Sequence, residues 1–317
     1  MILKTAVSNG GTILLATDFS KPARRAFTYA LKLAAVLKSR LILLHVIKAP
    51  PGFEGWSPAA RRSLEPLKTK ALLALGRVAR LAHENGVTAE HRLLVGIPVD
   101  SILKVAEGTR TDLIIMGTHG RTGWDRLQLG STAEAVLRKA PCPALTVHAS
   151  AVADSPVNPH RVKLNRILVA MDFSASSEAA LRCGAMLAER LKGEAVLVHA
   201  CEPSRRSRFG QTPGGASHRA DRRIQKAVSA SRADQIVRDR IILPGNPVEV
   251  ILDQAKSVRA DLIVMGPHGR RGMSRLMLGS VAESVVRRAG CPVLTVKAGV
   301  RERPEASKGT RRTPAPR

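Results

Sequence analysis

Two patterns of apolar residues alternate along this chain and indicate strands and helices in turn. Short runs that are apolar nearly throughout, such as residues 41–47 and 113–116, are typical of strands covered on both faces of a parallel sheet. Between such runs, apolar residues recur with the 3.6-residue spacing of an amphipathic helix, as in residues 27–37. Strands that alternate with helices predict an α/β fold with right-handed crossovers and a doubly wound sheet.

The first half of the chain carries signals for the ends of these elements as well. Ser20 and Pro22 are typical helix-start residues, Asn85-Gly86 is a helix-stop signal, and Gly96-Ile97-Pro98 opens another helix. A Pro/Gly-rich loop is expected at residues 49–58. The expected strands are residues 11–16, 41–47, 91–95, 113–116 and 144–147, and the expected helices are residues 20–37, 61–84, 97–108 and 131–139.

The second half of the chain repeats the first. Asp18-Phe19-Ser20 recurs as Asp172-Phe173-Ser174 with a shift of 154 residues, whereas residues 112–147 recur as 261–296 with a shift of 149, and 24 of those 36 positions are identical. The second copy therefore lacks five residues between its second and third strands. A length of 317 residues also favours two domains. We predict domains at residues 1–147 and 164–298, a linker at 148–163 and a disordered basic tail at 299–317. Residues 202–223 hold prolines, glycines and arginines and are predicted to be an irregular loop.

A glycine-spaced motif ends the fourth strand of each copy. Gly117-Thr118-His119-Gly120 is followed after nine residues by Gly130-Ser131, and Gly266-Pro267-His268-Gly269 is followed after nine residues by Gly279-Ser280. Bare backbone between a strand and a helix lets amide groups approach an anion closely, and the helix dipole adds to the attraction. The motif therefore predicts a phosphate site in each half.

These residues together resemble the universal stress protein family in its tandem two-domain form. The resemblance rests on the strand-end Asp18 and Asp172, on the Leu-Leu-His-Val of residues 43–46, and on the glycine spacing followed by Cys-Pro and a short last strand. It covers about residues 10–148 and 164–298. It implies five-stranded parallel sheets of order 3-2-1-4-5 with helices on both faces, adenine-nucleotide binding at the carboxyl ends of the strands, and pairing of the two domains through their last strands.

The resemblance also assigns roles to individual positions. It places adenine against the backbone near Val46 and Ala200, with Asp18 and Asp172 close to the base and ribose. The cofactor it implies is ATP, with or without Mg²⁺. The positions it assigns to ribose and the inner phosphates are Gly117, Gly120, Gly266 and Gly269, with His119 and His268 in the same loops, and those it assigns to the outer phosphates are Gly130, Ser131, Thr132, Gly279 and Ser280.

Several of these residues also have a simpler structural interpretation. Asp18 and Asp172 would also serve as helix-capping aspartates, and His45 and His199 are expected to be hydrogen-bonded core histidines rather than ligands. His119 and His268 would act as bases or would merely pack. Arginines 121, 126, 270 and 275 would add charge to the phosphates or be solvated. No Gly-Lys-Ser/Thr loop, nucleophile elbow or His-Glu-x-x-His motif is present, so we assign no catalytic residue and no metal ligand, and four cysteines without a C-x-x-C are expected to be small buried thiols.

The net charge of +26, from 51 basic and 25 acidic residues, raises the question of a polyanionic partner. Such a charge attracts nucleic acid, anionic membranes and acidic proteins without sequence preference. An aromatic content of 3% argues against sequence-specific recognition of single strands, and an arginine-rich genome composition would produce the same charge. No apolar run is long enough to span a membrane and the first residues lack an export signal, so we expect a cytoplasmic protein.

Three functions follow as hypotheses. The first is an ATP-binding stress or signalling protein in which the nucleotide changes a surface read by a partner. The second is a weak ATPase or phosphotransferase, and the third is a basic polyanion-binding scaffold with vestigial nucleotide sites. Under the first hypothesis we expect tighter binding in the first repeat, because Thr17, Thr118 and Thr132 correspond to Met171, Pro267 and Val281, each of which lacks a donor. The two repeats are expected to pair internally, and further self-association remains open.

Overall fold

The first repeat alternates strands and helices in the order that the sequence pattern predicts. Its elements are β1 (Thr12–Ala16), α1 (Lys21–Leu37), β2 (Arg40–Lys48), α2 (Pro58–Glu84), β3 (Ala89–Gly96), α3 (Pro98–Gly108), β4 (Leu113–Gly117), α4 (Ser131–Lys139) and β5 (Ala144–Val147). Ser20 is the N-cap of α1 and its Oγ accepts a hydrogen bond from the Ala23 amide at 3.3 Å. The predicted start of this helix is confirmed.

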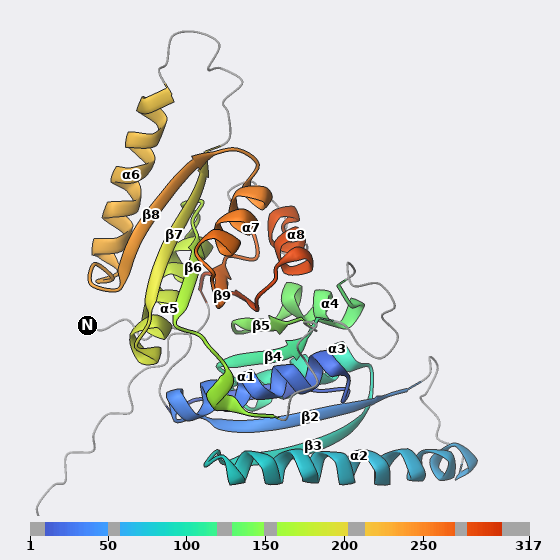
Figure 1. The fold of residues 1–317 in the computed structure, drawn as a ribbon. Helices are drawn as coiled ribbons and strands as arrows, with labels where there is room; N and C mark the ends of the chain where they lie inside the picture. The colour runs from blue at the N-terminus through green and yellow to red at the C-terminus, as the bar shows by residue number, and fades with distance from the viewer. Residues whose placement is uncertain are drawn as a thin grey trace, which may run out of the picture.

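The second repeat retraces the same order, as the computed structural model shows in Figure 1. Its elements are η1 (Pro159–Arg161), β6 (Arg166–Ala170), α5 (Ala175–Leu191), β7 (Glu194–Cys201), α6 (Pro213–Ala230), β8 (Val237–Pro244), α7 (Pro247–Ser257), β9 (Leu262–Met265), α8 (Ser280–Arg288) and β10 (Val293–Thr295). The structure describes residues 10–49, 58–118, 129–148, 157–201, 213–269 and 278–299. The predicted tail and much of the predicted linker therefore lie outside the described residues, and the domain boundaries stay a prediction.

One part of the sequence interpretation is wrong. Residues 213–223 were expected to be irregular, but they belong to α6. Pro213 is tolerated because it is the first helical residue, where its missing N–H has no intrahelical partner to lose. Further along, Ala220, Ile224 and Val228 are buried at four-residue spacing and hold the helix against the sheet. Residues 202–212 lie outside the described part of the chain.

All ten strands form a single sheet. Its order is β3-β2-β1-β4-β5-β10-β9-β6-β7-β8, so each repeat contributes the predicted order 3-2-1-4-5. The strands pair in parallel within each repeat, and β5 pairs with β10 in antiparallel orientation between the repeats. In Figure 1 the strands of the second repeat run nearly crosswise to those of the first. Within the described residues, no helix has the length and apolar character to cross a membrane.

Two hydrophobic cores lie on opposite faces of this sheet. One core contains residues of α1, α2, α5 and α6, and the other contains residues of α3, α4, α7 and α8. Successive strand residues serve the two cores in turn: Ile13 and Leu15 face one, and Leu14 faces the other. This alternation explains why the strands are apolar at every position rather than at every second one. Both cores extend across the two repeats.

The two repeats are joined by their last strands. Val293, Leu294 and Thr295 pair with Thr146, Leu145 and Ala144. Two buried hydroxyls reinforce the pairing, because the Thr146 Oγ1 donates to the Val293 oxygen at 3.2 Å and the Thr295 Oγ1 donates to the Ala144 oxygen at 3.3 Å. The predicted pairing of these edges is present, and it leaves neither strand with unpaired backbone groups along that side.

Lys297, two residues beyond β10, adds a polar contact to this junction. Its Nζ donates to the backbone oxygens of Arg138 at 2.7 Å and Ala140 at 3.0 Å, which lie at the carboxyl end of α4 in the other repeat. A cation there is favoured by the helix dipole. Burial lowers the pKa of Lys297 from its ordinary 10.5, although the lysine remains the donor in both contacts.

Replacement of Thr295 by proline tests the junction. Thr295→Pro removes a backbone N–H from a strand that has neighbours on both sides, so we expect unfolding free energy to fall by about 1–3 kcal/mol. Thr295→Val is the matched control, because it keeps the N–H and loses only the hydroxyl bond to Ala144. Urea unfolding of both variants measures the difference, and equal midpoints would show that the pairing contributes nothing.

Candidate functional site

A cavity of about 990 Å³ opens at the carboxyl ends of β1, β2 and β4 in the first repeat. Its volume lies within the range of roughly 300–1,000 Å³ that is typical of ligand sites. It lies where β1 has β2 on one side and β4 on the other, which is the topological switch point at which open α/β sheets bind ligands. The predicted site residues that line it are Asp18, Val46, Gly117, Gly130, Ser131 and Thr132.

Other predicted site residues have different outcomes. His119 and Gly120 lie outside the described residues. In the second repeat, Asp172 and Ala200 lie after and within the strands that correspond to β1 and β2, while Gly266, His268 and Gly269 follow β9. Gly279 and Ser280 begin α8 as Gly130 and Ser131 begin α4. The second set therefore occupies the equivalent places in the fold, and its role as a ligand site stays a prediction.

Sequence reasoning missed one wall of the cavity. Leu67, Lys70 and Ala74 of α2 line it, together with Lys48 at the end of β2 and Glu134 in the first turn of α4. The signal was present, because residues 67, 70 or 71, and 74 recur on one side of a helix. The sequence interpretation did not use this signal. The pattern shows which side of α2 is apolar, but it does not show that α2 continues beyond the ends of the strands and so reaches the cavity.

The turn after β1 and β6 is strained in both repeats. Phe19 and Phe173 have φ values of 63° and 64°, a left-handed conformation that costs a bulky residue roughly 1–2 kcal/mol. The preceding aspartate holds the turn, because Asp18 Oδ1 accepts from the Ser20 amide at 3.0 Å and Asp172 Oδ1 accepts from the Ser174 amide at 2.9 Å. The N-caps themselves are Ser20 and Ser174, so the aspartates hold the turn before each helix rather than cap it. A ligand role for the carboxylates stays a prediction.

The two strand-end histidines are satisfied by the fold, as expected. The His45 Nδ1 lies 2.7 Å from the Thr17 oxygen, and the His199 Nδ1 lies 2.7 Å from the Met171 oxygen. Each imidazole also packs against the strained phenylalanine, with ring centroids 4.7 Å and 4.6 Å apart. His45 additionally lines the cavity, so it fixes the shape of the wall on which Phe19 lies.

The first glycine of each motif is required by packing. A Cβ on Gly117 would lie 2.8 Å from the Pro22 Cβ and 3.0 Å from the Ala23 nitrogen, and a Cβ on Gly266 would lie 2.8 Å from the Ser176 Cβ. The first turns of α1 and α5 therefore press directly on the ends of β4 and β9. A Cβ on Gly269 would lie 2.8 Å from Asp172 Oδ2, so the second glycine lets the loop approach the aspartate.

The amino end of α4 supplies the anion-binding geometry. The Gly130 N–H is already used, because it donates to the Thr118 oxygen at 2.8 Å, and Gly279 repeats this bond to Pro267 at 2.8 Å. The first intrahelical bond runs from the Glu134 amide to the Gly130 oxygen at 3.0 Å, so the amides of residues 131–133 have no acceptor within the helix. Ser131, Thr132 and Ala133 all line the cavity. The donors therefore begin at Ser131, one residue later than the motif suggested.

One argument for unequal sites is wrong. The Thr118 N–H donates to the Val147 oxygen at 3.0 Å and Thr118 is fully buried, so this amide is not offered to a ligand. Its replacement by Pro267 in the second repeat therefore removes no ligand donor. Thr17 is different, because its Oγ1 accepts from the Phe19 amide at 3.1 Å and a hydroxyl that accepts can still donate. Thr17 and Thr132, which both line the cavity, keep their places in the argument.

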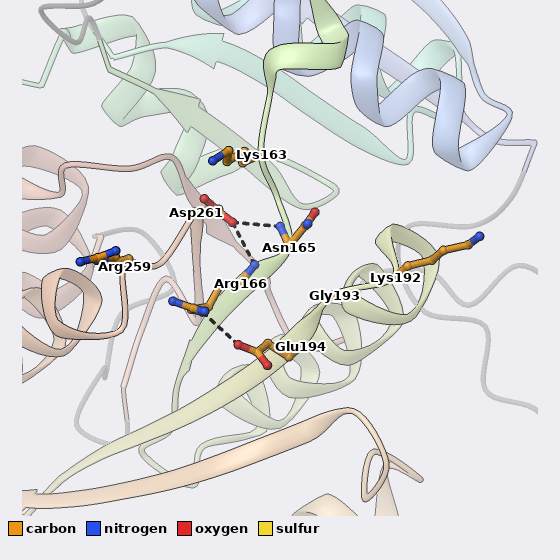
Figure 2. Close-up of a pocket in the computed structure, with 8 residues that line it drawn as sticks. All are labelled: Lys163, Asn165, Arg166, Lys192, Gly193, Glu194, Arg259 and Asp261. Atoms are coloured by element: carbon orange, nitrogen blue, oxygen red, sulfur yellow. Dashed lines mark hydrogen bonds and ion pairs between the residues drawn. The ribbon is translucent and has the colours of Figure 1, made fainter.

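A second cavity, of about 470 Å³, lies in the second repeat near the amino ends of β6 and β7 (Figure 2). Its carboxylates are used by the fold: Asp261 Oδ2 accepts from the amides of Asn165 and Arg166, both at 3.0 Å, and Glu194 pairs with Arg166 at 2.9 Å. In Figure 2 Arg259 and Lys192 lie on opposite sides, and the Lys192 side chain points away. The charged groups do not converge, so this cavity is a structural feature of the strand starts.

Metal and thiol chemistry find little support in the described residues. Among them, no group of three histidine, cysteine, aspartate or glutamate side chains could hold a metal ion. Cys142 and Cys183 are buried, as expected, and burial raises the pKa of both thiols to about 12. Cys201 and Cys291 are only partly buried, so the expectation of four buried thiols was wrong for these two.

The pKa of His268 can be used to measure the electrostatic environment of the glycine loop in the second repeat. Its pKa lies below the ordinary 6.5, first because burial disfavours the imidazolium and second because Lys297 is positive. The unfolded chain therefore binds this proton more strongly, so stability falls as the pH drops below 6.5 through the lowered value. We expect Lys297→Met to raise the pKa of His268 without restoring it fully, because burial remains.

NMR titration measures this shift, with the His268 resonance assigned by its loss in His268→Gln. Lys192→Met is the control, because it removes a lysine of the second cavity, near the amino ends of β6 and β7. An unchanged pKa of His268 in Lys297→Met would contradict the assigned cause.

Comparison with known proteins agrees with this architecture. The chain matches the universal stress protein family over residues 11–148 and again over 163–297. A universal stress protein from Mycobacterium tuberculosis is 25% identical over 301 residues, which span 90% of this chain and 96% of that protein. One from Methanocaldococcus jannaschii is 35% identical over 152 residues, 46% of this chain and 89% of its own length.

A solved structure extends the likeness to the whole molecule. The crystal structure of a universal stress protein from Archaeoglobus fulgidus has a TM-score of 0.70 and 26% identity to this chain, and the match covers 92% of this chain and 99% of that one. The strand order, the repeated glycine motif and the two family matches lead to one conclusion. This chain belongs to the universal stress protein family, with two copies of the family's domain in tandem.

Proposed function

We propose that the first repeat binds ATP in its strand-end cavity and that the protein acts in a stress response by presenting a surface that changes with nucleotide occupancy. The observation that carries this proposal is that the residues assigned to the nucleotide come together in one place. Six positions assigned to the nucleotide from sequence resemblance, drawn from four separate segments of the chain, line one cavity at the switch point. Chance placement would scatter such residues over the surface.

The electrostatics of the cavity suit a nucleotide. The amino end of α4 offers the amides of residues 131–133 and the positive end of its dipole to the phosphates. Lys48 and Lys70 add positive charge on the side of β2 and α2, and Asp18 offers a carboxylate at the strand end for a ribose hydroxyl. Glu134 also lines the cavity, so a phosphate chain would be accompanied by Mg²⁺ more readily than it would bind bare.

The rim of the cavity supplies the surface that a partner would read. Within the described residues, every exposed large apolar side chain lies on α2 or at Ile97, just before α3. Leu67 lines the cavity and is 52% exposed, and Ile97 is 61% exposed beside the cavity-lining Pro98. A nucleotide that contacts α2 would alter the exposure of apolar side chains at the rim such as Leu67. A partner that binds this rim would therefore distinguish the occupied protein from the empty one.

Serine-to-alanine variants test the assignment to the first repeat. Ser131→Ala removes a hydroxyl that donates to phosphate, and a hydrogen bond to a charged group contributes about 1.5–3 kcal/mol, so ATP affinity should fall roughly tenfold or more. Ser280→Ala is the matched control and should leave the tighter phase intact. Calorimetric titration with ATP, with and without Mg²⁺, measures both.

Absence of ATP binding by the unmodified chain, or equal loss in both variants, would overturn the proposal. Phosphate release under single-turnover conditions in the same samples separates a binding protein from a weak ATPase.

The inequality of the two sites is tested by exchanging one residue pair. Thr132 lines the first cavity and Val281 stands at the equivalent position, so the hydroxyl is present in one repeat only. Thr132→Val should weaken the tighter phase, and Val281→Thr should strengthen the weaker one, each by a few-fold up to about tenfold. If neither exchange moves its site, Thr132 faces away from the ligand and the inequality has another cause.

A further inference from the structure

The second repeat places an arginine where the first has an alanine. The Cζ of Arg223 on α6 lies 4.0 Å from the centre of the Phe173 ring, over its face. Phe173 is the strained residue that directly follows Asp172. Arg223 is therefore held at the strand-end turn that corresponds to the wall of the first cavity.

The correspondence with the first repeat follows from packing. Ala71, Leu75 and Ala79 are the buried residues of α2 at four-residue spacing, and Ala220, Ile224 and Val228 are those of α6. Arg223 precedes Ile224 just as Ala74 precedes Leu75. Ala74 lines the first cavity together with Phe19, so Arg223 beside Phe173 occupies the equivalent place in the second repeat.

The charge of Arg223 is not neutralised by the fold. Among the described residues, no carboxylate forms an ion pair with Arg223, whereas the nearby Arg240 pairs with Asp221 at 3.3 Å. Four residues earlier both repeats are basic, with Lys70 in the first and Arg219 in the second. At the position next to the phenylalanine ring, the second repeat thus adds Arg223, a planar cation positioned by that ring.

We propose that Arg223 makes the second site select an adenine nucleotide that carries a phosphate on its ribose. This inference rests on the nucleotide binding proposed for the first repeat being shared by the second, where the family resemblance places Asp172 near the ribose. In dinucleotide-binding folds an acidic residue bonds the free ribose hydroxyl, whereas the folds that take a ribose phosphate accommodate it with an arginine. A guanidinium matches phosphate oxygens with two parallel donors, and stacking on Phe173 fixes its plane beforehand.

The first site has no such group at the equivalent position, because Ala74 carries no charge. The two sites of one chain would then take different ligands: a plain nucleotide such as ATP in the first, and a ribose-phosphorylated adenine nucleotide in the second. The tandem arrangement gives this difference a use, since one molecule would respond to two metabolite classes.

Three probes isolate the ribose phosphate. Adenosine 2′,5′-bisphosphate and adenosine 3′,5′-bisphosphate differ from AMP only by that group. We expect the full chain to bind at least one bisphosphate roughly tenfold more tightly than AMP, the gain typical of one charge-assisted hydrogen bond. Arg223→Ala should remove that preference.

Two further variants complete the test by calorimetry. Arg222→Ala is the matched control, because it removes an equal charge from the neighbouring, exposed position of α6 and should keep the preference. Ala74→Arg should give the first site a preference for the bisphosphate. Equal affinities for AMP and both bisphosphates, or the same loss in Arg222→Ala and Arg223→Ala, would overturn the inference. In either case, ATP binding that remains sensitive to Ser131→Ala shows that the proposed function itself has not failed.

Discussion

The antiparallel pairing of β5 with β10 is the contact on which the rest of this structure depends. Each strand is short, three or four residues, and each is the last of its own five-stranded sheet. Left unpaired, either would expose a row of backbone donors and acceptors beside a buried core. Because they pair with each other, two sheets become one and both cores continue across the junction. Lys297 then ties the strand end of one repeat to the helix end of the other.

This junction also fixes how the two candidate sites stand relative to each other. α4 begins at the first cavity and ends at the carbonyls that bind Lys297. In the loop of the second repeat, burial and then the charge of Lys297 lower the pKa of His268. The path from one glycine loop to the other therefore runs through a single nine-residue helix and one side chain. Duplication within one chain favours this geometry, because the covalent link keeps the partner domain at a high effective concentration.

The duplication also serves as an internal comparison. Features that recur in both repeats are those the fold needs at the strand ends: the left-handed phenylalanine, the aspartate that holds it, the histidine packed on its ring and the glycine against the next helix. Features that differ lie on the walls contributed by α2 and α6, where Ala74 faces one cavity and Arg223 covers Phe173. The two repeats therefore share the turn at the strand ends and differ in the helix that covers it.

The sequence by itself determined the order of strands and helices, the duplication, the strand-to-helix turns and six of the residues around the cavity, because these depend on local periodicity and on motifs contiguous in the chain. It failed for residues 213–223, where burial of Ala220, Ile224 and Val228 against the sheet outweighed the loop-like composition. It also assigned the amides of Thr118 and Gly130 to a ligand, although Val147 and Thr118 already accept from them. Only the tertiary structure decided which backbone donors remain available to a ligand. It also decided that α2 lines the cavity and that Arg223 stacks on Phe173. The physical reason is that contacts between segments far apart in sequence form only once packing has brought those segments together.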